Sequence, residues 1–274
     1  MELLVIGGTG TIGSLLVEEL RTRGHAVRVA GRSTGFDLTR PSTWAATFEG
    51  VRRCFYLSPR TVPQHAEVGA AVFAALRQAR VQRVVNLTGF GVDRAVGTPL
   101  FELERELERS GLEYTHVRPN YVMQNLCAGP AWRELVERDE LSSVAAEAAI
   151  SWVDARDIAA VCTAALERDD LVGPGLDLTG PVGVTQAQFA SALSNALGRT
   201  VRSVSLDDAA GRARLLSQGV PPERIEARLG FLALARTGAL APVSPHVEAV
   251  LGRPAISVET FARDYAARWT REVA

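Results

Sequence analysis

The chain has 274 residues, of which 47% are hydrophobic and 22% charged, a composition typical of a globular enzyme and not of a disordered or fibrous protein. Its 30 basic residues nearly balance its 31 acidic residues, which argues against nucleic acid or an anionic membrane as a partner. Every basic residue is arginine, so Schiff-base chemistry, a Walker-type phosphate lysine and a tyrosine–lysine catalytic pair are excluded.

The N-terminal segment indicates a cytoplasmic protein. The apolar run Leu3-Leu4-Val5-Ile6 starts almost at once, without a basic leader, and no run of about 18 apolar residues follows. Cys54, Cys127 and Cys162 are far apart in apolar surroundings, which predicts buried, reduced thiols. No spacing among the cysteines and the four histidines suits a metal ion, so no metal site is expected.

Short apolar runs alternate with longer segments of helical period over the first 120 residues. This alternation predicts stacked βα units around a parallel sheet. The expected strands are residues 3–6, 26–30, 54–57, 83–87 and 114–117. Helices are expected directly after the first strand and over residues 66–80, 101–109 and 158–166.

The expected helix 101–109 has a simple charge pattern. Leu103 and Leu107 lie on one side, while glutamates alternate with arginines along the rest. Such alternation is typical of a solvated face. The glutamates expected on that face are Glu102, Glu104, Glu106 and Glu108.

Beyond residue 120 the pattern loosens, and Gly173-Pro174-Gly175, Gly180-Pro181 and Pro221-Pro222 indicate turns between shorter elements. The predicted fold class is α/β, with a Rossmann-type doubly wound parallel sheet and a smaller C-terminal substrate lobe. We expect the nucleotide-binding domain over residues 1–165 and the α/β substrate lobe over residues 166–274. The lobes are expected to interleave around residues 120–180.

A glycine-rich turn directly follows the first strand and opens an amphipathic helix. In this context the turn predicts a dinucleotide site, because backbone N–H groups at the helix N-terminus can bind a pyrophosphate. Gly7 allows the tight turn, Gly10 lets the backbone approach the phosphate, and Gly13 lets the helix pack closely on the strand. The other residues expected at this site are Thr9, Thr11 and Ile12. The alternative is a plain βα turn.

The end of the second strand indicates which dinucleotide binds. An NAD site usually has an acidic residue there for the ribose 2′-hydroxyl, whereas this strand ends in Ala30-Gly31-Arg32. The Arg32 guanidinium suits a 2′-phosphate, so the expected cofactor is NADP(H). The alternative is a solvated arginine at the start of a loop.

With these residues and several later motifs, the chain resembles the NmrA-like family of atypical short-chain dehydrogenases/reductases. The motifs look closest to the ergot-alkaloid-type imine reductases and bacterial relatives in secondary metabolism. The resemblance implies NADP(H), a small-molecule substrate, and further cofactor contacts from Ser58, Pro59, Thr88 and Asn120. The later motifs are Pro41-Ser42-Thr43-Trp44, Phe55-Tyr56-Leu57-Ser58-Pro59, Arg118-Pro119-Asn120, Val153-Asp154-Ala155-Arg156-Asp157 and Leu178-Thr179-Gly180-Pro181.

The chain departs from that family at its catalytic pair. The family's tyrosine and lysine align near Val96 and Leu100, and neither side chain can move a proton. Thr88 and Tyr121 are the remaining candidate catalytic groups around a developing charge. Tyr121, Gln124 and Asn125 are the expected substrate contacts, and for each of these residues a purely structural role stays open.

An acceptor that needs little help with proton transfer suits such a site. We expect an NADPH-dependent reductase of an activated C=N, quinone or conjugated C=C bond, because the developing charge is small or delocalised there. One alternative is a catalytically silent, NADP(H)-sensing regulatory protein, and another is a non-redox isomerase or cyclase on the same fold. The expected assembly is a monomer or a small homo-oligomer.

Overall fold

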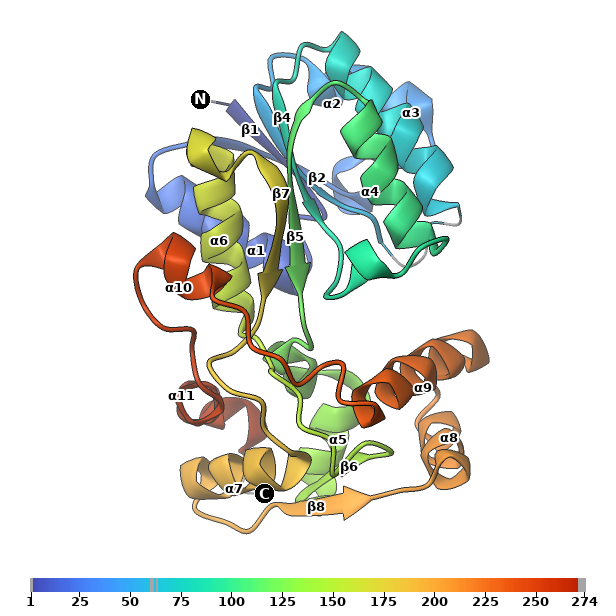
Figure 1. Ribbon diagram of the computed structural model, residues 1–274, viewed down its shortest axis with the longest axis vertical. Helices are drawn as coiled ribbons and strands as arrows, with labels where there is room; N and C mark the ends of the chain where they lie inside the picture. The colour runs from blue at the N-terminus through green and yellow to red at the C-terminus, as the bar shows by residue number, and fades with distance from the viewer. Residues whose placement is uncertain (1, 60–61, 63, 271–274) are drawn as a thin grey trace. The chain divides into compact units, whose positions relative to one another are not determined.

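A computed structural model describes residues 2–59, 62 and 64–270, which form two compact units (Figure 1). The chain passes between the units several times. Unit 1 comprises Met1–Pro119, Ala155–Leu178 and Pro245–Arg253. Unit 2 comprises Asn120–Asp154, Thr179–Ser244 and Pro254–Ala274.

A six-stranded, all-parallel sheet forms the centre of unit 1, in the order β2-β1-β3-β4-β5-β7. The strand order reverses between β1 and β3, and ligands of open α/β sheets bind at such a point. The strands are β1 Glu2–Ile6, β2 Ala26–Ala30, β3 Arg53–Leu57, β4 Arg83–Leu87, β5 Glu113–Pro119 and β7 Gly173–Leu178. The five strands expected from the sequence are therefore confirmed.

The sequence pattern did not predict strand β7. Residues 173–175 read Gly-Pro-Gly and were expected to form a turn, but they begin this strand at the edge of the sheet. Glycine and proline are tolerated on edge strands because one side of the strand donates no ladder hydrogen bonds. Gly175 has a packing reason as well, since an added Cβ would lie 2.3 Å from the Arg118 guanidinium.

Helices cover both faces of the sheet, which confirms the doubly wound arrangement (Figure 1). Helices α3 and α4 pack together on one face, and α1 packs with α6 on the other. The helices of unit 1 are α1 Thr11–Thr22, α2 Ala45–Phe48, α3 His65–Gln78, α4 Pro99–Arg109, α6 Ala155–Glu167 and α10 His246–Leu251. Its 3₁₀ turns are η1 Arg32–Thr34, η2 Pro41–Thr43, η3 Val92–Arg94 and η5 Asp169–Leu171.

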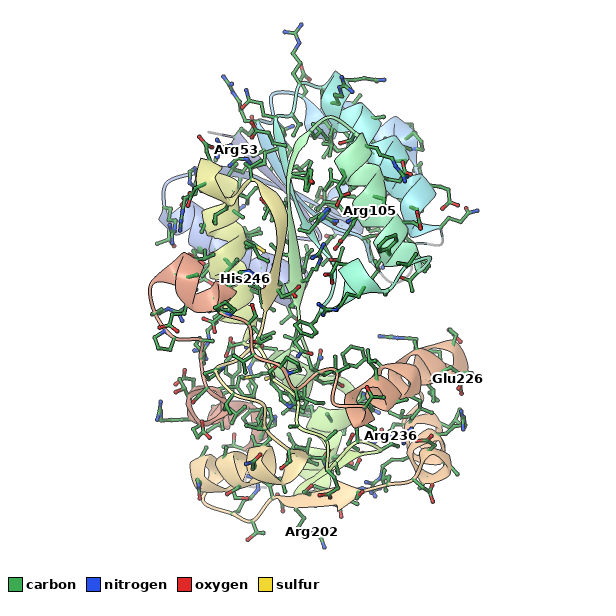
Figure 2. All side chains as sticks on the ribbon, in the orientation of Figure 1. Arg53, Arg105, Arg202, Glu226, Arg236 and His246 are labelled. Carbon is green, nitrogen blue, oxygen red and sulfur yellow. The ribbon has the colours of Figure 1, made fainter. Side chains whose placement is uncertain are left out.

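The later segments of unit 1 explain why the chain does not divide at residue 165 as expected. Strand β7 pairs with β5, and α6 contacts α1, β3 and β4. A hydrogen bond joins helix α10 to β7. His246 Nδ1 accepts the Asp177 N–H at 3.0 Å, and the His246 side chain is labelled in Figure 2. These contacts place residues 155–178 and 245–253 in the nucleotide-binding unit.

Unit 2 contains a two-stranded parallel sheet, helices and an aromatic core. In that core the Phe189 ring makes edge-on contacts with Trp152 and Phe261, whose centroids lie 5.0 and 6.0 Å away. Its strands and helices are β6 Glu140–Ser143, β8 Arg202–Ser205, α5 Gly129–Arg138, α7 Gln186–Leu197, α8 Asp208–Ser217, α9 Pro222–Arg236 and α11 Val258–Asp264, and its 3₁₀ turns are η4 Met123–Cys127 and η6 Ala266–Trp269.

The three cysteines are free thiols, and two of them are buried as expected. Cys54 and Cys162 are buried free thiols, whereas Cys127 is a free thiol that is partly exposed. Within the described residues, no helix is long and apolar enough to cross a membrane. No group of three or more potential metal ligands occurs in the same part of the chain.

Candidate functional site

The glycine turn between β1 and α1 has the backbone geometry that its sequence predicts. Gly7 adopts φ +85°, a region that glycine enters without a Cβ penalty, so the tight turn requires it. The Gly7 N–H donates to the Ala30 carbonyl at 3.0 Å and the Gly10 N–H donates to the Gly7 carbonyl at 3.1 Å. The turn is thereby fixed to the ends of β1 and β2.

The N-terminus of α1 fits a pyrophosphate. Gly10 is its N-cap and no side chain caps the first turn, so backbone N–H groups there point outward without a side-chain partner. A Cβ added at Gly10 would meet no atom nearer than 3.5 Å, whereas one added at Gly13 would lie 2.2 Å from the Gly7 carbonyl oxygen. Gly13 therefore packs the helix on the turn itself. Thr9 and Thr11 are exposed and Ile12 is half-buried beside this opening.

Arg32 directly follows β2 and begins the short 3₁₀ turn η1. Its side chain is exposed, and no hydrogen bond or ion pair engages the guanidinium within the described part of the chain. The carboxylate nearest to this position in sequence, Asp37, accepts the Thr39 N–H and hydroxyl at 2.8 Å each. These bonds, and to a smaller extent the charges of Arg40 and Arg32, hold the pKa of Asp37 below its usual value. Asp37 makes no direct bond to the Arg32 fork, which suits a phosphate.

Ser58 and Pro59 follow β3, one strand from the glycine turn in the sheet. Ser58 is buried and its Oγ shares a hydrogen bond of 2.7 Å with His65 Nδ1. Burial lowers the pKa of His65, so its ring is neutral at pH 7. Pro59 is exposed. Of the two, Pro59 has the free surface that a cofactor contact needs.

Thr88 lies at the end of β4, and its hydroxyl donates to Glu104 Oε1 at 2.6 Å. Glu104 was expected on a solvated helix face, but its side chain is completely buried. The expectation was wrong because Glu104 lies between Leu103 and Leu107 on the face of α4 that packs on the sheet. The Thr88 proton is thus already directed toward a carboxylate.

Arg118 on β5 neutralises this buried carboxylate. Its Nε donates to Glu104 Oε1 at 2.9 Å and its Nη2 donates to Oε2 at 2.6 Å, a bidentate pair. Burial raises the pKa of Glu104, but the Arg118 and Thr88 hydrogen bonds outweigh it and hold the pKa below its usual value. Glu104 is therefore an anion at neutral pH. Because Thr88 donates its hydroxyl proton to Glu104, the Thr88 oxygen can serve a ligand only as a hydrogen-bond acceptor.

A second buried polar residue, His116, lies beside this pair. His116 and Asn86 face each other in the β4–β5 register, and Asn86 Nδ2 lies 3.2 Å from His116 Nδ1. Glu108 Oε1 lies 3.3 Å from Nε2. Burial nevertheless lowers the pKa of His116 to about 4, so the ring is neutral at pH 7.

The positions where the family's catalytic pair aligns carry no replacement for it. Val96 lies in the loop before α4 and is 76% exposed. Leu100 is in the first turn of α4, after the Thr98 cap and Pro99. Both side chains are hydrocarbons, so neither can supply a proton to an acceptor.

In unit 2, Asn120 and Gln124 are both buried and engaged with the protein. Asn120 Nδ2 donates to Ser151 Oγ at 2.8 Å and to the Leu240 carbonyl at 2.9 Å, while its Oδ1 accepts the Tyr121 N–H. Gln124 Nε2 donates to Asp154 Oδ1 at 2.7 Å. These bonds give both amides a structural role within unit 2.

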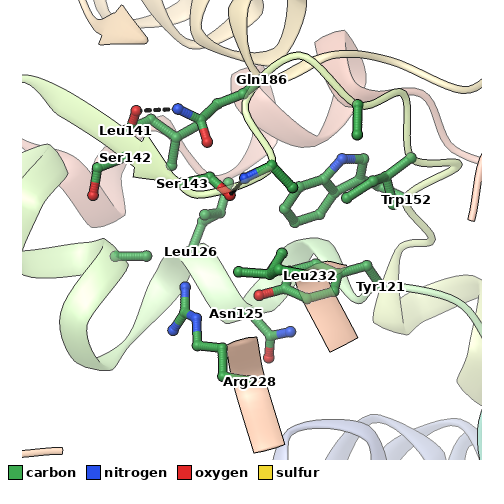
Figure 3. A pocket seen from close by; sticks show the side chains of 14 residues that line it. Tyr121, Asn125, Leu126, Leu141, Ser142, Ser143, Trp152, Gln186, Arg228 and Leu232 are labelled. Atoms are coloured by element: carbon green, nitrogen blue, oxygen red, sulfur yellow. Dashed lines mark hydrogen bonds between the residues drawn. The ribbon is translucent and has the colours of Figure 1, made fainter. Parts of the chain in front are cut away.

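Tyr121 and Asn125 line one pocket of unit 2, whose empty space of about 510 Å³ includes the open solvent at its mouth (Figure 3). The Tyr121 ring makes an edge-on contact with Trp152, at a centroid distance of 4.4 Å. Gln124 is not among the lining residues, so the structure brings only two of the three expected substrate contacts together. The remaining lining residues are Leu126, Ala131, Leu141, Ser142, Ser143, Ala145, Ala148, Ile150, Trp152, Gln186, Arg228 and Leu232.

Two functional candidates were missed from the sequence, Glu104 and Arg228. A helical wheel would have indicated Glu104, because it is four residues after Leu100 and next to the buried Leu103. Arg228 has no such local signal. It lies on α9, far along the chain from Tyr121, and only tertiary folding brings the two to one pocket.

Comparison with known proteins agrees with this architecture. Residues 7–169 match a family described as NAD(P)H-binding. The chain is 33% identical to the NAD(P)H azoreductase of Xenophilus azovorans, over 97% of this chain and 98% of that protein. It is 27% identical to a festuclavine dehydrogenase of Aspergillus fumigatus, over 99% and 100%. An NADPH-dependent quinone oxidoreductase of Escherichia coli, solved with NADPH, has the same fold with a TM-score of 0.82 and 21% identity, over 96% and 99%.

Proposed function

The chain belongs to the NAD(P)H-binding family, and we propose that it is an NmrA-like atypical short-chain dehydrogenase/reductase that reduces an activated C=N, quinone or conjugated C=C bond of a small organic molecule with NADPH. Oxidoreductase activity with a nicotinamide cofactor follows from this membership. The acceptor class is the proposal. Relatives named azoreductase and festuclavine dehydrogenase support it, since both names denote redox chemistry on nitrogen-containing molecules.

The turn residues Gly7–Gly13 and Arg32 are proposed to hold the cofactor. The uncapped N-terminus of α1 would bind the pyrophosphate, with Thr9, Thr11 and Ile12 beside it. The unpaired Arg32 guanidinium would bind the 2′-phosphate and so favour NADPH over NADH. When bound, NADPH supplies a hydride. Pro59 and the lone pairs of Thr88 are proposed as further contacts.

The bond between Thr88 and Glu104 is the observation that supports the acceptor class best. A hydroxyl that donates its proton to a buried, arginine-paired carboxylate is a poor proton donor to an acceptor. The chain has no lysine, and Val96 and Leu100 occupy the places of the catalytic pair. Hydride transfer to a ketone leaves a negative charge on its oxygen, which needs a proton at once. A quinone or an enone delocalises that charge, and an iminium develops none.

Tyr121 is proposed to contact the acceptor, together with Asn125. Both line the unit 2 pocket, whose aromatic wall of Tyr121 and Trp152 suits a flat, conjugated molecule. For Asn120 and Gln124, direct ligand contacts stay predictions, because their amides already bond within the protein. The cytoplasmic location, the monomer or small homo-oligomer and a role in secondary metabolism likewise remain predictions.

Steady-state oxidation of NADPH across an acceptor panel tests the proposal. The panel contains a quinone, a cyclic iminium, a conjugated enone, an azo compound and an unactivated ketone. We expect turnover of the activated acceptors and little of the ketone. Tight NADPH binding without turnover of any acceptor would contradict an enzymatic role and favour the sensor alternative.

A further inference from the structure

The charge of the unit 2 pocket is set by one residue. Among the lining residues named above, Arg228 is the single formally charged side chain, and no lining residue is acidic. The rest of the lining is aliphatic, aromatic, amide or hydroxyl. The pocket is therefore a mostly apolar cavity with one fixed positive charge, the arrangement by which a small number of polar groups orient a ligand.

The Arg228 guanidinium has no partner among the residues that the structure describes. It projects from α9 toward the pocket, on the other side from Trp152 (Figure 3). The structure records neither an ion pair nor a hydrogen bond for this side chain anywhere in the described ranges, and its residue is only partly exposed. Other arginines of unit 2 differ in this respect, for example Arg214, whose Nη2 donates to Glu140 at 3.0 Å.

The nearby carboxylate that could pair with Arg228 is already occupied. Glu134 lines the adjoining cavity together with Arg228. Its Oε2 accepts the Ser142 hydroxyl at 2.5 Å, and its Oε1 accepts Gln218 Nε2 at 3.0 Å and lies 3.7 Å from Arg214 Nε. Glu134 is thus engaged by Ser142, Gln218 and Arg214, and no ion pair with Arg228 is recorded among the described residues.

Two aromatic side chains, Tyr121 and Trp152, also line the pocket. The Tyr121 ring contacts Trp152 edge-on and lies at 30° to the Phe231 ring, with a centroid distance of 5.4 Å. A flat, conjugated ligand can pack on these rings, and an anionic substituent on it can reach a guanidinium that lines the same pocket.

We propose that this pocket selects a planar, conjugated acceptor that carries an anionic group, and that Arg228 binds that group. This inference rests on the proposed reductase function and specifies its substrate class. A carboxylate, sulfonate or phosphate ester offers the paired oxygens that the arginine fork recognises. A neutral acceptor of the same shape would leave the Arg228 charge partly desolvated and unpaired, which costs affinity.

The test compares two probes of one shape, anthraquinone-2-sulfonate and its neutral analogue anthraquinone-2-sulfonamide. Calorimetry measures the binding of each probe to the full-length protein without NADPH. We expect the sulfonate to bind about ten- to a hundredfold more tightly, the range of one charge-assisted bond. Arg228→Gln should remove this preference by weakening the binding of the sulfonate, whereas the sulfonamide should bind at least as tightly as before because no charge is left to desolvate.

A matched control lies on the same helix. Arg224 is exposed one helical turn before Arg228 and does not line the pocket, so Arg224→Gln removes one positive charge and should keep the sulfonate preference. Equal affinities of the two probes in the unmutated protein, no binding of the sulfonate, or equal losses in both variants would overturn the proposal.

Turnover of the same probes with NADPH separates this inference from the function on which it rests. Reduction of both quinones with equal kcat/KM would overturn the anion selectivity and leave the reductase function standing. Selective, Arg228-dependent binding without any NADPH oxidation would keep the anion site and contradict the reductase function.

Discussion

The Thr88 hydroxyl lies 2.6 Å from a carboxylate oxygen of Glu104, a side chain that is completely buried and held by Arg118 through two further hydrogen bonds. Thr88 belongs to the end of β4 and Glu104 to the middle of α4, so the bond joins the sheet to the helix that covers it. A threonine at this place is oriented by the protein, because its proton is donated to Glu104.

Glu104→Gln should destabilise the protein strongly. The substitution removes the negative charge and leaves the buried Arg118 guanidinium only the more distant Asp93 carboxylate, 3.8 Å from its Nη1. Breaking comparable buried pairs costs about 3–5 kcal/mol. Glu102→Gln, on the same helix, is the control and should change the free energy of unfolding by about 0.5 kcal/mol or less. Denaturant unfolding of the unmutated protein and the two variants measures these differences. Equal free energies of unfolding would show that the pair of Glu104 and Arg118 contributes nothing to stability.

Gly10→Val should abolish NADPH binding while the protein still folds. Its backbone conformation, φ −85° and ψ 175°, is open to any residue, and the added Cβ meets only ordinary contacts. The side chain would occupy the space proposed for the pyrophosphate. Gly13→Ala is the contrast, because its Cβ would clash with the Gly7 carbonyl and should lower the melting temperature. Unchanged NADPH affinity in a normally folded Gly10→Val protein would place the phosphate site elsewhere.

Arg32→Ala should lower the affinity for NADPH about ten- to a hundredfold and leave that for NADH unchanged, since a charge-assisted bond to phosphate contributes about 1.5–3 kcal/mol. Arg52→Ala removes an exposed arginine before β3, at the other end of the strands, and should affect neither affinity. Titration of NADPH and NADH into the unmutated protein and the two variants measures these affinities. The assignment of Arg32 is wrong if the unmutated protein binds the two nucleotides equally.

His116 should make the protein less stable as the pH falls from 7 to 5. Its folded pKa of about 4 lies below the unfolded value of about 6.5, so the unfolded chain binds a proton first and stability decreases through this window. This difference between the folded and unfolded pKa values lowers the free energy of unfolding by about 2 kcal/mol between pH 7 and pH 5. The charged groups that act on the ring are Glu104, Arg118 and Arg105, and their effects are smaller than that of burial.

The comparison with His116→Asn isolates this group, because the other histidines titrate equally in both proteins. The pH dependence of the free energy of unfolding should be shallower in the variant by that amount, whatever its absolute stability. Parallel curves for the two proteins would mean that His116 takes up its proton over the same pH range in the folded and unfolded states, and would contradict the prediction.

The glycine turn and five of the strands could be predicted because their signals are local: an apolar run, a turn residue, a helical period. Strand β7 could not, since Gly173 and Gly175 indicate a turn and only the space needed by Arg118 explains the second glycine. Glu104 was misplaced for a related reason, because its partner Arg118 is 14 residues away. Arg228 depended entirely on tertiary folding.

The central claim is that the enzyme reduces acceptors that need no proton from the protein. The most direct measurement is the ratio of kcat/KM for two bicyclic acceptors of similar size, 1,4-naphthoquinone and the unactivated ketone 1-tetralone, with NADPH. The account predicts that the quinone exceeds the ketone by at least about a hundredfold, the usual contribution of the acid–base group that the site lacks. It also predicts that Thr88→Val changes the quinone rate by no more than about tenfold. Efficient reduction of 1-tetralone, lost in Thr88→Val, would contradict the account and identify Thr88 as a proton donor.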